Sequence, residues 1–214
     1  MTALPERFRH IVVEGAIGVG KTTLARLIAQ RAGAESLLED PHANPFLPGF
    51  YRDMQRYAFP TQMFFLRQRV GQLDALFGSG TSARPVVADF LLDKDALFAR
   101  LTLTEDEFAL YDEYYRLLAP RMPTPDLVIY LQAPVDALIA RVRRRGETFE
   151  RGISEAYLRD LDVEYTRFFH EYTASPLLIV NSEHLNFVDR PQDFELLLRR
   201  ITEVRGGREF FNRG

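Results

Sequence analysis

A glycine-rich segment near the N-terminus constrains the fold of this chain more than any other feature of its sequence. It reads GAIGVGKT over residues 15–22 and matches the pattern G-x-x-x-x-G-K-[ST], known as the P-loop. The apolar run Ile11-Val12-Val13 before it is typical of a buried strand, and Thr22–Ala32 after it has the apolar spacing of a helix. A strand, a glycine turn and a helix in this order predict a site for a nucleoside triphosphate.

The chemistry of such a segment depends on its backbone. The glycines let the chain curl until successive N–H groups point at phosphate oxygens. Lys21 is expected to reach the β- and γ-phosphates, and the Thr22 hydroxyl to bind Mg²⁺. The residues expected to hold the nucleotide phosphates are Gly15, Ala16, Ile17, Gly18, Val19, Gly20, Lys21, Thr22 and Thr23. A glycine turn that merely happens to contain a lysine is the alternative, and the flanking strand and helix disfavour it.

Short apolar runs alternate with helical patterns along the rest of the chain. The runs expected to form strands are Phe8–Val13, Ser36–Leu38, Pro85–Ala88, Leu127–Leu131 and Leu177–Val180. Further helices are expected at Pro60–Phe77, Phe90–Arg100, Phe108–Leu118, from Ser154 towards Tyr172, and at Gln192–Val204. Strands that read as continuous apolar runs predict a parallel sheet with helices on both faces. We therefore expect a single three-layer α/β domain over residues 1–214, with a five-stranded parallel sheet and a surface loop at Gly78–Pro85.

The bulk composition disfavours several classes of protein. The chain has 27 basic and 30 acidic side chains and a net charge of −3, so no overall positive field favours nucleic acid as a partner. It has no cysteine, which excludes disulfides and thiolate metal sites. Its apolar runs are too short to span a membrane, and the first residues, MTALPERFRH, lack the apolar core of a signal peptide. A cytoplasmic protein is expected.

Two carboxylates stand directly after predicted strands, at the edge where ligands bind in parallel α/β sheets. Glu39 follows the second strand and is suited to take the proton from an attacking hydroxyl group. Asp89 follows the third strand and is suited to hold Mg²⁺ or its water molecules. Asp89 could equally cap the helix expected at Phe90–Arg100. Asp40 and Pro41, by contrast, are explained as the start of a helix.

Arginine is concentrated in one segment, at Arg141, Arg143, Arg144 and Arg145. Arg141 and Arg145 are four residues apart, so they share one face of a helix. Such a run could be a solvated surface. It also resembles a lid whose cations cover a phosphoryl group during transfer and keep water away from it. We expect an arginine-rich lid at about residues 141–153.

Taken in order, these residues resemble the deoxynucleoside kinase family over roughly Arg9–Ile201. The resemblance implies a P-loop kinase fold that transfers a phosphoryl group from ATP, with Mg²⁺, to the 5′-hydroxyl of a deoxynucleoside. Glu39 then has the role of the base. Lys21, Asp89, Arg141 and Arg145 join it as catalytic residues. A homodimer is also implied.

The resemblance extends to the residues that would hold the acceptor nucleoside. Tyr51 and Glu150 match family positions that bind the 3′-hydroxyl of the sugar. Gln62 and Arg69 match positions that read the base, together with a carboxylate that is Asp95 here. This set occurs in purine- and pyrimidine-preferring relatives alike. A purine deoxynucleoside is favoured because bacterial relatives of this length are commonly deoxyadenosine or deoxyguanosine kinases.

The chain departs from the family pattern at two positions. The family's strand-end acid is normally followed by arginine and serine, whereas Asp89 is followed by Phe90 and Leu91. Lys94, one helical turn further, is a candidate to replace that arginine. Glu147 stands where relatives often carry another lid arginine.

Two alternative functions follow from these observations. A nucleoside monophosphate kinase of the thymidylate kinase type would share the P-loop and the arginine lid. The carboxylate of Glu39 disfavours it, because an acceptor that is already anionic would be repelled. A nucleotide-binding module that has lost catalysis is kept open by the missing arginine at position 90.

Overall fold

Six parallel strands form one sheet in the computed structural model, which describes residues 5–78, 80, 82–118 and 123–212. The strands are β1 (His10–Gly15), β2 (Glu35–Leu37), β3 (Val86–Ala88), β4 (Leu127–Gln132), β5 (Leu177–Asn181) and β6 (Arg208–Phe211). Their order in the sheet is β2-β3-β1-β4-β5-β6, and every neighbouring pair is parallel. Strands β2 and β3 therefore lie on one side of β1, and β4, β5 and β6 lie on the other. A ligand crevice is expected where the strand order reverses, which is at the segment that follows β1.

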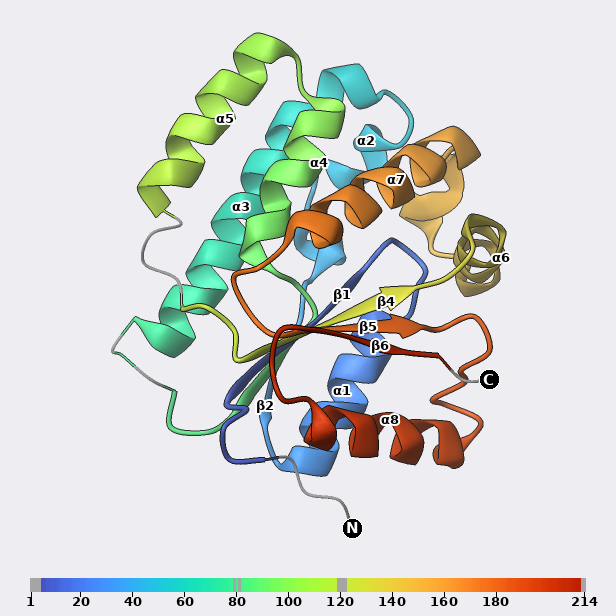
Figure 1. Ribbon diagram of the computed structural model, residues 1–214. Coiled ribbons are helices and arrows are strands. Elements are labelled where there is room, and N and C mark those ends of the chain that lie inside the picture. Colours follow the sequence, from blue (N-terminus) through green and yellow to red (C-terminus); the bar gives the residue numbers. More distant parts are fainter. Residues whose placement is uncertain (1–4, 79, 81, 119–122, 213–214) are drawn as a thin grey trace.

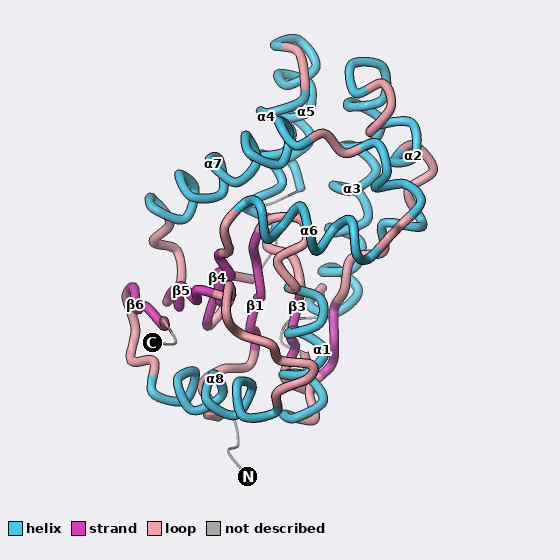
Figure 2. The backbone as a smooth tube through the Cα atoms, turned by 90° about the vertical axis from the view of Figure 1, so that its right-hand side faces the viewer, coloured by secondary structure: helices cyan, strands magenta, loops and turns pink. Residues whose placement is uncertain are grey.

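Helices cover both faces of this sheet, as Figures 1 and 2 show. They are α1 (Lys21–Ala32), α2 (Leu47–Phe50), α3 (Met54–Phe77), α4 (Asp95–Thr102), α5 (Glu105–Leu118), α6 (Val135–Arg145), α7 (Glu155–Glu171) and α8 (Pro191–Glu203), with short 3₁₀ helices η1 (Pro41–Ala43), η2 (Leu92–Lys94) and η4 (Thr148–Gly152). The helices α1 and α8 lie on one face, and α3, α4 and α7 lie on the other. The expected three-layer α/β fold is confirmed.

The sheet has one strand more than the five that the sequence predicts. Strand β6 pairs with β5 at the sheet edge, with Leu177 opposite Arg208 and Val180 opposite Phe211. Its residues, REFF, alternate between exposed and half-buried positions. An edge strand that is covered only in part needs no continuous apolar run, so the pattern that identifies the other strands is missing here.

Helices α3 and α4 begin furthest from their expected first residues, and α5 begins at Glu105 instead of Phe108. Helix α3 begins at Met54 because the Asp53 carboxylate accepts a hydrogen bond from the Arg56 N–H at 3.3 Å, and Pro60 lies inside the helix rather than at its start. The helix expected at Phe90–Arg100 begins only at Asp95. The chain before it is extended at Leu91, whose N–H donates to the Glu14 carboxylate at 2.8 Å.

Side chains cap the first turns of α5 and α7, and the expected surface loop is present in its described part. Thr104 and Glu107 form the reciprocal bonds of a capping box at the start of α5. The Ser154 hydroxyl accepts from the Tyr157 N–H at 3.1 Å and caps α7. The loop expected at Gly78–Pro85 joins α3 to β3, although residues 79 and 81 lie outside the described part of the chain. Among the described residues, no helix is long and apolar enough to cross a membrane.

Candidate active site at the carboxyl edge of the sheet

The glycine-rich segment lies where β1 ends and α1 begins, so the expected strand, loop and helix are all present. Gly18 and Gly20 have φ angles of 88° and 102°, which side chains rarely allow. A Cβ atom on Gly18 would lie 2.8 Å from the carbonyl oxygen of Leu138 in α6. The loop is therefore held close to the arginine-bearing helix. Burial is the main factor that lowers the pKa of Lys21, and the charge of Lys94 adds to it.

A cavity of about 610 Å³ opens beside this loop, a size that suits a small ligand. Most residues predicted to serve the site lie in its wall, namely Lys21, Thr22, Glu39, Tyr51, Gln62, Arg69, Asp89, Arg145 and Glu150. Apolar side chains complete the wall, including Leu47, Phe50, Phe65, Phe98 and Phe149. Among the predicted catalytic and acceptor-binding residues, Arg141 and Asp95 do not belong to this wall, and neither do Gly15, Ala16, Val19 and Gly20 of the glycine-rich loop. The cavity thus has one end at the glycine-rich loop and a second, largely apolar end with a few polar side chains between α2, α3 and α4.

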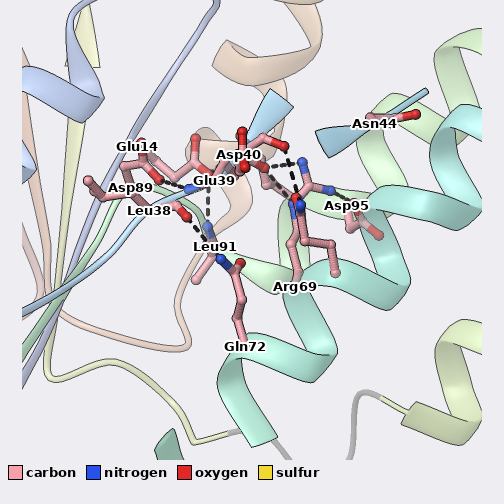
Figure 3. A network of polar contacts seen from close by, with 12 residues as sticks. Glu14, Leu38, Glu39, Asp40, Asn44, Arg69, Gln72, Asp89, Leu91 and Asp95 are labelled. Carbon is pink, nitrogen blue, oxygen red and sulfur yellow. Dashed lines mark hydrogen bonds and ion pairs between the residues drawn. The ribbon is translucent and has the colours of Figure 1, made fainter. Parts of the chain in front are cut away.

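Glu39 lies between these two ends. Its carboxylate accepts a hydrogen bond from Arg69 Nε at 2.6 Å and lies 4.0 Å from Lys94 Nζ. Figure 3 shows Arg69 reaching from α3 towards both Glu39 and Asp95. Burial alone would raise the pKa of Glu39, but the charges of Arg69, Lys94 and Lys21 lower it to about 2. Glu39 is therefore ionised and aimed into the cavity.

Asp89, which directly follows β3, connects the segment after β2 with the start of α1. Its carboxylate accepts from the Thr22 hydroxyl at 2.5 Å and from the Glu39 backbone N–H at 2.8 Å. Burial and the nearby Glu39 charge raise its pKa, against the effect of these hydrogen bonds. Hydroxyl and carboxylate oxygens are hard donors, the type that Mg²⁺ prefers. The Thr22 and Asp89 oxygens lie close enough to serve one ion. Asp89 does not cap a helix, so the alternative interpretation of its position is wrong.

Lys94 supplies a cation that the sequence only suggests. Its ammonium group lies 2.9 Å from Glu14 Oε1, and the side chain is 1% exposed. Phe90, by contrast, is buried in the core and is not part of the cavity wall. Lys94 belongs to that wall, so the structure brings a positive charge to the site from η2 instead of from position 90.

Glu14 is a buried carboxylate next to the site that the sequence patterns do not identify. It is fully buried at the end of β1, where it pairs with Lys94 and accepts hydrogen bonds from the Leu91 N–H and from the Tyr165 hydroxyl at 3.1 Å. One signal could have identified it. A carboxylate that interrupts an apolar strand directly before a P-loop needs a buried partner.

Asp95 lies behind Arg69 instead of facing the cavity. It is fully buried, forms an ion pair with Arg69 and accepts from the Tyr111 hydroxyl at 2.7 Å. The cavity wall between α2, α3 and α4 therefore presents Gln62 and Arg69, with Asp95 as a support. Gln62 Nε2 donates in turn to the Thr102 hydroxyl at 3.3 Å.

The segment predicted to form a lid contributes Arg145 and Glu150 to the wall of the same cavity. Arg145 Nε, at the end of α6, donates to the Glu150 carboxylate at 3.0 Å. Tyr51 lies nearby, and a Cβ atom on Gly152 would lie 2.8 Å from the Tyr51 carbonyl oxygen. Arg141 points elsewhere and donates to the carbonyl oxygen of Ser182 at 2.8 Å. The two arginines share a helix, but only Arg145 reaches the cavity.

Glu147 also contacts the loop that carries the candidate base. Its carboxylate lies 3.6 Å from His42 Nε2 in η1. The ring of His42 packs edge-on against Phe149, with the ring centres 5.1 Å apart. The lid and the segment that follows Glu39 therefore touch at the mouth of the cavity.

Comparisons with known proteins agree with this geometry. Residues 11–205 match the family described as deoxynucleoside kinase. The chain is 34% identical over 199 residues to a deoxyguanosine kinase of Bacillus subtilis, an alignment that covers 91% of this chain and 96% of the relative. It is 29% identical to a deoxyadenosine kinase of Lactobacillus acidophilus, with 90% and 94% covered. The solved structure of a deoxyadenosine kinase from M. mycoides with bound dATP has a TM-score of 0.77 and 24% identity, with 90% of this chain and 99% of that chain covered.

Proposed function

The chain belongs to the deoxynucleoside kinase family and is an ATP-dependent phosphotransferase, and we propose that it phosphorylates the 5′-hydroxyl of a purine deoxynucleoside. One observation carries this proposal. Lys21 of the phosphate loop and the ionised carboxylate of Glu39 border a single cavity, close enough for the lysine charge to lower the pKa of the acid. An alcohol held between them would meet a terminal phosphate and a proton acceptor together.

In the proposed reaction the 5′-oxygen bonds to the γ-phosphorus of ATP as the bond from that phosphorus to ADP breaks. The 5′-hydroxyl proton passes to Glu39. A carboxylate with a pKa of about 2 is a weak base. Phosphoryl transfer has a loose transition state and depends mainly on positioning, so a weak base that accepts the proton late is sufficient.

The remaining roles follow from position. The backbone N–H groups of residues 16–22 and the Lys21 ammonium hold the phosphates of ATP. Thr22 and Asp89 would hold Mg²⁺, which would neutralise charge on those phosphates. Arg145 covers the transferring group, while Arg141 braces the phosphate loop through the Val19 and Ser182 carbonyl oxygens.

Lys94 takes the role of the arginine that is missing at position 90. Its ammonium group reaches the same cavity as Lys21 and Glu39 and is held between two carboxylates, those of Glu14 and Glu39. A cation at this place would stabilise the charge that develops on the acceptor oxygen and the phosphoryl group. The replacement of position 90 is therefore no sign of lost catalysis.

The part of the cavity away from the glycine-rich loop has polar side chains suited to bind the acceptor nucleoside. Tyr51 and Glu150 lie in the wall near the lid and would bind the sugar hydroxyl, with Gln62 and Arg69 at the base. Asp95 contributes by holding Arg69 in place. The Glu39 carboxylate would repel an acceptor that already carries a phosphate, which disfavours a nucleoside monophosphate kinase.

The purified protein should be incubated with ATP, Mg²⁺ and a panel of deoxynucleosides and their 5′-monophosphates. We expect 5′-monophosphates to form from the nucleosides and no diphosphates to form from the monophosphates. Conversion of monophosphates alone would make it a monophosphate kinase. ATP binding without turnover of either set would make it a catalytically inactive module.

The enzyme is further proposed to act in the cytoplasm as a homodimer. Three exposed apolar side chains, Leu110, Tyr114 and Leu117, recur at helical spacing on α5 and offer a surface to a second copy. Sedimentation of the wild-type protein should give the mass of a dimer, and Leu117→Asp should shift it to the monomer. A wild-type monomer would refute this arrangement.

A further inference from the structure

Thr102, at the end of α4, fixes the direction of the Gln62 amide. The Thr102 hydroxyl lies 2.7 Å from the carbonyl oxygen of Phe98, and only the hydroxyl can donate in that pair. A hydroxyl has one proton. Its oxygen must therefore accept in the second bond, the 3.3 Å contact to Gln62, so the amide nitrogen and not the amide oxygen faces Thr102.

This assignment leaves Gln62 Oε1 as the free end of the amide. Gln62 is 3% exposed and lies in the cavity wall. None of the described residues donates a hydrogen bond to Oε1. The surrounding protein does not fully enclose this oxygen, so a ligand can reach it. A ligand base would thus meet an acceptor here.

The nearby donors are already engaged. Arg69 is 4% exposed, and it directs Nε to Glu39 and Nη1 to Asp95. Asp95 is held on its other oxygen by the Tyr111 hydroxyl. A carbonyl group on the base would have to compete with two carboxylates for this guanidinium group.

We propose that Thr102 is a positioning residue that makes the enzyme select bases with an exocyclic amino group. Through Thr102, Gln62 Oε1 accepts from the amino group of a 6-aminopurine or a 4-aminopyrimidine. The 6-oxo or 4-oxo counterpart would set two acceptors against each other. This inference rests on the proposed function and narrows its substrate class.

The discrimination also depends on the sugar being anchored. Tyr51 and Glu150 lie in the wall of the same cavity, so a sugar bound there would limit the base to rotation about its glycosidic bond. An unmatched buried polar group costs enough to lower kcat/KM on the order of 10- to 100-fold.

Deoxyadenosine and deoxyinosine provide the test, because they differ only in the 6-amino or 6-oxo group and in the proton that N1 carries beside the 6-oxo group. The wild-type kcat/KM should favour deoxyadenosine on the order of 10- to 100-fold. Thr102→Val keeps the side-chain shape without the hydroxyl and frees the amide to rotate. This preference should fall roughly tenfold in that variant.

Thr102→Ser is the matched control, because it keeps the hydroxyl and should restore the wild-type ratio. A purely structural role for Thr102 would lower both rates equally, and an unchanged ratio in Thr102→Val would overturn the inference. If that variant fails to fold, equal or better use of deoxyinosine by the wild type would overturn it as well. Failure to phosphorylate any nucleoside would instead refute the proposed function itself.

Discussion

Buried titratable side chains are charged at the carboxyl edge of the sheet, whereas the buried His10 at the amino edge is neutral. At the carboxyl edge, Glu14, Glu39, Lys94 and Arg69 are buried as ion pairs around a cavity. At the amino edge, His10 begins β1 with no hydrogen-bond partner for either ring nitrogen among the described residues, and burial lowers its pKa to about 4, so it is neutral. The buried charges thus lie at the edge with the proposed site for charged ligands, and the neutral His10 ring lies at the edge where it serves only packing.

The difference is informative because buried ion pairs are poor stabilisers. Desolvation can cancel their mutual attraction, and an apolar replacement is often as stable. The cluster at the carboxyl edge is better explained by function than by stability. Variants at that edge should change turnover most, and variants of His10 should change acid stability with no effect on turnover.

The largest effect is expected for Glu39→Gln. Loss of the proton acceptor should lower kcat by roughly 10²- to 10⁴-fold, since general bases contribute on that order. ATP affinity should stay nearly unchanged, because the phosphate loop does not need this carboxylate. Turnover measurements with an ATP titration check both expectations.

Glu35→Gln is the control for that variant, because Glu35 lies on β2 and its side chain forms, among the described residues, only an exposed contact to Arg84. It should behave as the wild type. Retention of turnover in Glu39→Gln would exclude Glu39 as the base.

A somewhat smaller loss is expected for Lys94→Met. It removes the cation and should lower kcat by about 10²- to 10³-fold, the range seen when one charge-stabilising donor is removed. It also leaves the buried Glu14 carboxylate without its ion-pair partner and lowers stability. The double variant Glu14→Gln/Lys94→Met should restore the melting temperature and leave turnover low.

Lys94→Arg keeps the charge and should retain part of the rate. Full recovery of turnover along with stability in the double variant would contradict a catalytic role for Lys94. In that case the pair would be structural, and the contrast between the two edges would weaken.

Gly152→Ala should have a moderate and selective effect. A Cβ atom there would lie 2.8 Å from the Tyr51 carbonyl oxygen and 3.1 Å from Tyr51 Cβ, so the sugar site must shift. We expect the nucleoside KM to rise on the order of tenfold through misplacement, with the ATP KM unchanged. Gly71→Ala, with no atom within 4 Å of the added Cβ, is the control. Equal changes in both KM values would show a general loss of structure.

The smallest effect on turnover, none at neutral pH, is expected for His10→Phe. The folded-state pKa is about 4, below the unfolded value of about 6.5, so the unfolded chain binds more protons between these values. The stability from the neutral ring is complete above pH 6.5 and is lost as the pH falls towards 4, by about 3 kcal/mol in all.

Urea unfolding at pH 7.5 and pH 5 checks this expectation. The wild type should lose about 2 kcal/mol more than His10→Phe between the two values. Equal losses would mean that His10 is not the group that titrates.

Much of the phosphate end could be predicted from the sequence. Glycine spacing, a lysine and a preceding strand define a backbone geometry on their own, and Glu39 and Asp89 follow from the ends of strands. The proposed sugar and base contacts of Tyr51 and Gln62 came from family resemblance, and both residues line the cavity.

The rest depends on tertiary packing. Arg141 and Arg145 share a helix face in the sequence pattern, but the loop after β5 captures Arg141. Asp95 is turned behind Arg69 by the Tyr111 hydroxyl, a contact between two helices. Thr102 gave no signal, because its role depends on a hydrogen bond to Gln62 forty residues away.

A crystal structure of the complex with a deoxynucleoside and ADP would test the central claim most directly. The 5′-oxygen should lie about 3 Å from the Glu39 carboxylate, on the side that faces Lys21 and Lys94. A nucleoside bound with its 5′-oxygen away from Glu39, or Glu39 turned out to solvent in that complex, would contradict the account.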